Sequence, residues 1–150
     1  MMRVAIVGGG PAGLMAAEQI SAVDGIEIDL FDAMPSVGRK FLIAGMGGMN
    51  ITHAEPLPSF IERYQDRADW LAPMLHEFGP QALREWIHGL GFETFVGSSG
   101  RVFPREMKAA PLLRAWLHRL RSRGVRFHVR HRWLGWAGEA QGAPLRFMTS

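Results

Sequence analysis

The chain of 150 residues contains no cysteine, and this absence excludes a group of functions. Disulfides, thiolate metal sites, iron–sulfur clusters and redox-active cysteine pairs all depend on that side chain. If the protein transfers electrons, a bound cofactor must therefore carry them.

Long apolar runs are also missing. No run approaches the roughly 18 apolar residues of a membrane span. A secretory signal is disfavoured because the glycines of residues 8–13 interrupt the apolar N-terminal stretch, and Glu18 precedes any convincing cleavage site. We therefore expect a cytoplasmic protein without a membrane partner.

Several catalytic patterns are absent too. The six histidines include no His-Glu-x-x-His pair, so no metal site is predicted. The Gly-Ser-Ser-Gly of residues 97–100 is not a nucleophile elbow, because Arg101 stands two positions after Ser99. No nucleophile–base pair stands out, and the catalytic residues stay unknown.

The charge is modest but uneven. The net charge is +3, and seven arginines gather between Arg114 and Arg132. Such a run is compatible with a nucleic-acid patch, although a solvated helix face and a sheet edge explain it more often. We expect a small-molecule substrate and no nucleic acid; the oligomeric state stays open.

The most informative segment lies at the N-terminus. A short apolar strand, residues 4–7, runs into Gly-Gly-Gly-Pro-Ala-Gly at residues 8–13 and then into a helix rich in small residues. In this dinucleotide fingerprint Gly8 permits the tight turn, Gly10 lets a pyrophosphate approach, and Gly13 allows close packing. The helix start, with Pro11 and Ala12, offers N–H donors to phosphate. A P-loop is excluded because no Gly-Lys-Ser/Thr follows.

A second strand, residues 26–31, ends on Asp32, which lies 19 residues past Gly13. At this spacing a carboxylate binds a ribose hydroxyl, and Ala33 follows at the same place. The alternative role for Asp32 is a cap or turn acid.

Residues 35–53 form a glycine-dense stretch without helical or strand periodicity. Because its apolar residues argue against disorder, we interpret it as a backbone surface that lies against a ligand. Arg39 and Lys40 are candidates to pair with phosphates, and solvent-facing loop charges are the alternative.

The remaining pattern alternates helices and strands. Residues 57–90 are helical, with Pro80 in the first turn of the last helix. Residues 92–96 and 101–103 form a hairpin, and an amphipathic helix follows from Pro111 to Gly124. Residues 125–133 alternate as one half-buried strand, and residues 136–150 form another hairpin. We expect residues 125–129 to lie parallel to the first two strands in the order 3-2-1, with Trp133 near the adenine edge.

Three blocks carry a family resemblance. They are Gly-Arg-Lys-Phe-Leu-Ile-Ala-Gly at residues 38–45, Met-Gly-Gly-Met-Asn-Ile-Thr-His at 46–53, and Gly-Arg-Val-Phe-Pro at 100–104 with Lys-Ala-Ala at 108–110. Together they resemble the bacterial BaiN-like flavoproteins, described as NAD(P)/FAD-dependent or aminoacetone-oxidase-type enzymes. Gly48 and Met49 replace that family's usual arginine and cysteine.

The resemblance implies a fold, a cofactor and a site. The fold would be an α/β, Rossmann-like FAD/NAD(P)-binding fold with a parallel sheet. It would be incomplete, with the start of an inserted α+β segment, because family members are longer. The cofactor would be FAD, with NAD(P)H as a reductant, in a flavin-dependent oxidoreductase. An NAD(P)-binding dehydrogenase or a bare dinucleotide-binding module is the alternative.

The candidate cofactor-binding residues come from the fingerprint, the glycine-dense stretch and the third strand. They are Gly8, Gly10, Pro11, Ala12, Gly13, Asp32, Ala33, Arg39, Lys40, Gly45, Gly47, Gly48, Met49, Asn50, Thr52 and Trp133. The expected organisation is a cofactor-binding β-α-β unit with the flavin loop (1–55), a helical and hairpin insertion (56–108), and a helix, third strand and hairpin (109–150).

Overall fold

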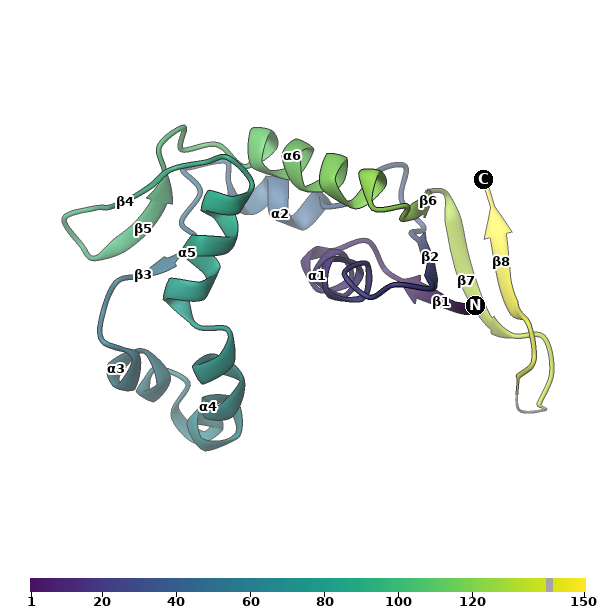
Figure 1. Ribbon diagram of the computed structural model, residues 1–150, viewed down its shortest axis with the longest axis horizontal. Coiled ribbons are helices and arrows are strands. Elements are labelled where there is room, and N and C mark those ends of the chain that lie inside the picture. Colours follow the sequence, from purple (N-terminus) through teal and green to yellow (C-terminus); the bar gives the residue numbers. More distant parts are fainter. Residues whose placement is uncertain (140–141) are drawn as a thin grey trace. The chain divides into compact units, whose positions relative to one another are not determined.

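The computed structural model describes residues 1–139 and 142–150. The described chain separates into two compact units (Figure 1). The first unit combines Met1–Ile43 with Leu113–Ser150, and the second is Ala44–Leu112. The first unit is thus built from two stretches that lie far apart in the sequence.

A three-stranded parallel sheet forms the centre of the first unit. Its strands are β1 (Met2–Val7), β2 (Ile26–Phe31) and β6 (Arg126–His128), in the order β1-β2-β6. Asp29 of β2 pairs with Arg126, and Val4 of β1 pairs with Ile28. The parallel third strand on the outer side of the second is therefore confirmed, and so is the Rossmann-like α/β fold.

Helices and a hairpin cover this sheet. Helix α1 (Pro11–Ile20) follows β1, and α6 (Ala109–Ser122) precedes β6. Their apolar side chains bury the core with β2, as the amphipathic pattern predicts. Buried core residues of the first unit include Leu14, Ala17, Ile28, Leu30, Trp116, Leu120 and Val125. Figure 1 shows α1 on one side of β1 and β2, and the β7–β8 hairpin on the other.

The prediction of a single strand over residues 125–133 is wrong in its length. β6 ends at His128, and β7 (His131–Trp136) pairs with β8 (Leu145–Thr149) in a separate antiparallel sheet. Between them the backbone reverses at Arg130, whose φ is +58° and whose N–H donates to the carbonyl of Met34 at 3.0 Å. The turn contains no glycine, proline or asparagine, so the alternating pattern continues through it unbroken.

The hairpin expected at residues 136–150 consequently begins five residues earlier, at His131. Its residues 140–141 lie outside the described part of the chain. Phe147 of β8 stacks on Phe31 of β2 with ring centroids 4.1 Å apart, and His128 stacks on Phe31 at 4.6 Å. These aromatic contacts attach the hairpin to the parallel sheet.

The stretch of residues 35–53 is more ordered than its composition predicts. It contains the short helix α2 (Arg39–Ala44) and the strand β3 (Thr52–His53). A helix of six residues is shorter than two turns, so its sequence shows no apolar period. Gly38, whose φ is +70°, precedes it, and its N–H donates to the carbonyl of Gly9 at 2.8 Å.

The second unit combines helices with a small antiparallel sheet. Its helices are α3 (Leu57–Glu62), the 3₁₀ turn η1 (Gln65–Arg67), α4 (Ala68–Glu77) and α5 (Pro80–Gly89). The sheet has the order β3-β5-β4, with β4 at Thr94–Val96 and β5 at Arg101–Pro104. The predicted helices and the predicted hairpin are confirmed, with Pro80 at the start of α5. No helix of the described residues has the length and apolar character to cross a bilayer.

Candidate functional site

The turn between β1 and α1 is shaped by backbone contacts that only glycine permits. Gly8 has a φ of +106°, and its N–H donates to the carbonyl of Phe31 at 2.8 Å. A Cβ at Gly13 would collide with the carbonyl oxygen of Gly8, so this glycine brings α1 close to the end of β1.

Gly10 differs from these two. A Cβ built at Gly10 would meet nothing within 4 Å, and its φ of −79° suits any residue. The protein's own packing therefore does not require glycine here. Open space beside this backbone is what the approach of a pyrophosphate requires.

The N-terminus of α1 faces this turn without a cap. Gly10 provides no side-chain cap, and the first turn holds no acidic residue. The Leu14 N–H donates to the carbonyl of Gly10 at 2.9 Å, and Pro11 has no N–H. Within the described residues, the N–H groups of Ala12 and Gly13 have no hydrogen-bond partner. Two free donors at the positive end of a helix dipole suit a phosphate oxygen.

Asp32 lies at the carboxyl end of β2 and braces the same turn. Its Oδ2 accepts from the N–H of Gly9 at 2.7 Å, and its Oδ1 accepts from the N–H of Met34 at 2.7 Å. The turn-acid role is thus present. A carboxylate has about four acceptor positions, so capacity remains for a further donor such as a ribose hydroxyl. Ala33, next in the chain, is half-buried.

Gly9 is a further position of this turn that sequence reasoning missed. A Cβ here would collide with Val37 and lie 3.0 Å from Asp32 Oδ2. Gly9 is buried, and its N–H holds the Asp32 carboxylate. The fingerprint gives no signal for it, because the residue occupies a variable position between the first two required glycines.

The charged pair after β2 is exposed. Arg39 and Lys40 both lie in the first turn of α2 with solvent-accessible side chains. Arg39 Nη1 is 3.4 Å from Ser36 Oγ, at the long limit of a hydrogen bond. Both cations are free to approach a phosphate, and their role stays a prediction.

Six other candidates belong to the second unit, where a short segment is fixed against β5 and the residues around the start of α6. A Cβ at Gly45 would collide with Ala109, and the N–H of buried Met49 donates to the carbonyl of Met107 at 3.0 Å. Asn50 Nδ2 donates to the carbonyls of Thr52, at 2.9 Å, and Val102, at 3.1 Å.

The backbone of Met49 and the side chain of Asn50 thus stabilise this segment itself. Gly48 has a φ of +113°, and a Cβ at Gly47 would meet nothing within 4 Å. Gly47 is exposed, and no neighbour within 4 Å would meet a Cβ there, so its backbone is open to a ligand.

Trp133 does not lie where it was predicted. It belongs to β7 of the hairpin, is 42% exposed, and makes an edge contact with Trp136 at 6.3 Å. Ligands in open α/β sheets bind beyond the carboxyl ends of the parallel strands. The residues that follow β6 there are Val129 and Arg130, so the prediction of Trp133 at the end of the third parallel strand is wrong.

The strongest electrostatic cluster of the parallel sheet surrounds Asp29. Arg126 donates to both carboxylate oxygens at 2.8 and 2.9 Å, and His128 Nε2 lies 2.7 Å from Oδ1. These bonds, above all those of Arg126, hold the pKa of Asp29 well below its usual value, although burial opposes the shift. The paired carboxylate in turn raises the pKa of Arg126. The cluster joins β2 to β6 within the sheet.

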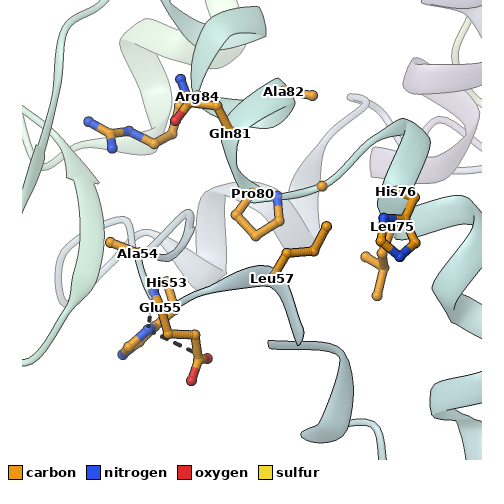
Figure 2. A pocket seen from close by; sticks show the side chains of 11 residues that line it. His53, Ala54, Glu55, Leu57, Leu75, His76, Pro80, Gln81, Ala82 and Arg84 are labelled. Atoms are coloured by element: carbon orange, nitrogen blue, oxygen red, sulfur yellow. Dashed lines mark hydrogen bonds and ion pairs between the residues drawn. The ribbon is translucent and has the colours of Figure 1, made fainter. Parts of the chain in front are cut away.

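A cavity of about 260 Å³ lies in the second unit between the segment before α3 and the start of α5 (Figure 2). Leu57 and Pro80 lie toward its centre in the view. His53 Nδ1 accepts from the Glu55 N–H at 3.1 Å, so its Nε2 donates to the carbonyl of Ser99 at 3.0 Å. Glu55 is ion-paired with Arg63. Both polar groups are engaged by protein partners, and no nucleophile–base pair forms among these residues.

The glycine turn at the end of β1, the uncapped helix and the acid at the end of β2 define a Rossmann-like domain. Residues 2–148 match the profile of the HI0933-like protein Rossmann domain. The chain belongs to this family.

Curated relatives match parts of the chain. A 3-dehydro-bile acid delta(4,6)-reductase of Clostridium scindens is 28% identical over 130 residues, which cover 86% of this chain and 31% of that protein. An FAD-dependent monooxygenase of Strobilurus tenacellus is 44% identical over 45 residues, 30% of this chain and 10% of that protein. The chain thus spans at most about a third of the length of these relatives.

Solved structures share the fold. The THI4 protein of Thermovibrio ammonificans superposes with a TM-score of 0.59 at 17% identity, covering 97% of this chain and 45% of that one. At this identity the likeness concerns architecture alone. It agrees with the Rossmann-like assignment.

Proposed function

We propose that this chain is the dinucleotide-binding part of an FAD-dependent oxidoreductase of the BaiN-like type. The observation that carries the proposal is the open backbone at Gly10 beside the free N–H groups of Ala12 and Gly13. A pyrophosphate fits such a cradle because nothing in the protein fills it and the helix dipole favours negative charge.

The relatives' names favour FAD among the dinucleotides. One relative is named an FAD-dependent monooxygenase and another a reductase. Bound FAD would supply hydride or electron transfer, chemistry that a chain without cysteine cannot perform with its own side chains. Asp32 would accept from the ribose, and Arg39 and Lys40 would approach the phosphates.

The finer assignments rest on the sequence resemblance. We propose NAD(P)H as the reductant and a small molecule as the substrate, in a cytoplasmic bacterial enzyme. The segment around Gly47 would approach the flavin ring with its exposed backbone.

The absorbance spectrum of the purified intact protein tests the proposal. We expect a yellow protein with flavin bands and tighter binding of FAD than of NADH or NADPH. A colourless protein that binds NAD(P)H and does not bind added FAD would contradict the flavin assignment. It would favour an NAD(P)-dependent dehydrogenase, because the turn presents the same cradle to either pyrophosphate.

A further inference from the structure

Glu18 is a buried acid on the cofactor-facing helix of the first unit. It lies in the second half of α1, and its side chain is only 6% exposed. Burial of a carboxylate is costly unless the charge is paired and hydrogen-bonded. The groups that pair with this carboxylate therefore indicate why an acid is buried at this position.

All three of its side-chain partners come from α6 or the residue just after it. Trp116 Nε1 donates to Oε2 at 3.0 Å, while Arg119 and Arg123 donate to Oε1 at 3.1 and 2.9 Å. Arg123 also reaches the backbone carbonyl of Glu18 at 3.4 Å. Both carboxylate oxygens are thus fixed, one of them by two charge-assisted bonds.

These contacts restrain a short helix at one end, while its other end carries the free donors. Helix α1 has ten residues, and Glu18 lies about two turns from Pro11. At the opposite end Gly13 lies close to the backbone of Gly8 at the end of β1. Rotation or tilt of α1 would break the bonds of Glu18, so these bonds limit how far the first turn of the helix can move.

We propose that Glu18 is a positioning residue that orients the N-terminus of α1 toward the pyrophosphate. The inference rests on the proposed function, because it needs a phosphate at that terminus. It predicts more than added stability: without Glu18, α1 should loosen at its first turn, and cofactor affinity should fall while the protein remains folded.

The test compares Glu18→Gln with Val125→Ala, a truncation of a buried residue outside α1. Glutamine keeps the shape but leaves Arg119 and Arg123 facing a neutral amide. In the cofactor-free protein we expect faster hydrogen exchange at the Leu14 amide, which reports the first turn of α1. In the intact protein we expect about tenfold weaker FAD binding. Val125→Ala should lower the unfolding temperature but leave FAD affinity at the wild-type value, and it should speed exchange at Leu14 no more than at core amides outside α1.

If Glu18→Gln and the control lose stability but keep the same Leu14 exchange and FAD affinity, Glu18 is merely structural and the proposal is overturned. If Glu18→Gln does not fold, Trp116→Phe removes one bond and keeps a ring in place; unchanged exchange and affinity there would also overturn it. If the wild-type protein binds no FAD, the proposed function fails by itself. The Leu14 exchange then still decides whether Glu18 orders the helix start.

Discussion

At the scale of single residues, the glycines of the turn differ in their roles: the fold requires glycine at Gly13, whereas at Gly10 only a ligand would. Gly13 must be glycine because its Cβ would meet the backbone of Gly8, whereas Gly10 has open space around it. Substitution at Gly10 should therefore affect binding much more than folding.

Gly10→Val tests this difference. We expect FAD affinity to fall by more than about tenfold, because the side chain fills the space meant for phosphate oxygens. The free energy of unfolding should change by about 1 kcal/mol or less, the cost of a poorer helix start. Gly138→Val is the matched control, since a Cβ there also meets nothing within 4 Å. Wild-type FAD affinity in Gly10→Val would place the pyrophosphate elsewhere.

Asp32 joins a structural and a proposed binding role in one side chain. Removal of a charge-assisted bond to ribose costs about 1.5–3 kcal/mol, so Asp32→Ala should weaken FAD binding about ten- to a hundredfold. Calorimetric titration of the intact protein measures this. If the dissociation constant is unchanged and the unfolding temperature falls, Asp32 has only a structural role, through its bonds to Gly9 and Met34.

At the scale of elements, the Asp29 cluster ties the short strand β6 to β2. β6 pairs with β2 at only three positions, so side-chain bonds carry much of the attachment. Arg126, His128 and the more distant Arg3, at 3.5 Å, all face the Asp29 carboxylate. The strand pairing should consequently depend on the ionisation of Asp29.

This gives a defined pH dependence. Because the pKa of Asp29 is lowered in the folded protein, its contribution is complete above the unfolded value of about 4 and is lost as the pH falls below it. Asp29→Asn should cost about 2 kcal/mol at pH 7 and lose less stability than wild type between pH 5 and pH 3. Urea unfolding at several pH values measures both effects. Asp24→Asn, which removes an exposed acid, is the control. If the free energy of unfolding of Asp29→Asn falls with pH in parallel to that of the wild type, the ionisation of Asp29 does not stabilise the fold.

At the scale of the whole molecule, the curated relatives that this chain matches are longer than the chain. It spans 31% of its reductase relative. Within the described residues, β1 pairs with β2 along one edge only. Parallel strands are ordinarily buried on both faces and flanked by further strands.

We therefore expect residues 1–150 alone to bind FAD weakly and to show no NAD(P)H oxidation, whereas a longer protein that contains them should do both. Retained flavin after gel filtration and NAD(P)H turnover measure the difference. Stoichiometric flavin with steady turnover in residues 1–150 would show that this part is sufficient.

Local chemistry determined much of the fold. Three elements are determined by residues close together in the sequence. They are the glycine turn of residues 8–13, the apolar strands beside it and the amphipathic helix after Pro111. A parallel third strand beside the second follows from the order 3-2-1 of the doubly wound sheets that begin with such a β-α-β unit. These features were predictable from the sequence alone.

Only the tertiary structure decided the rest. The turn at Arg130 depends on bonds to Met34 and Asp32, about a hundred residues away along the chain, so periodicity extended the strand to Trp133. Gly9 matters because Val37 and Asp32 pack against it, and Glu18 because Trp116, Arg119 and Arg123 meet it across the fold. A sequence pattern records what a residue prefers locally. Which distant groups fill its surroundings is determined when the chain folds.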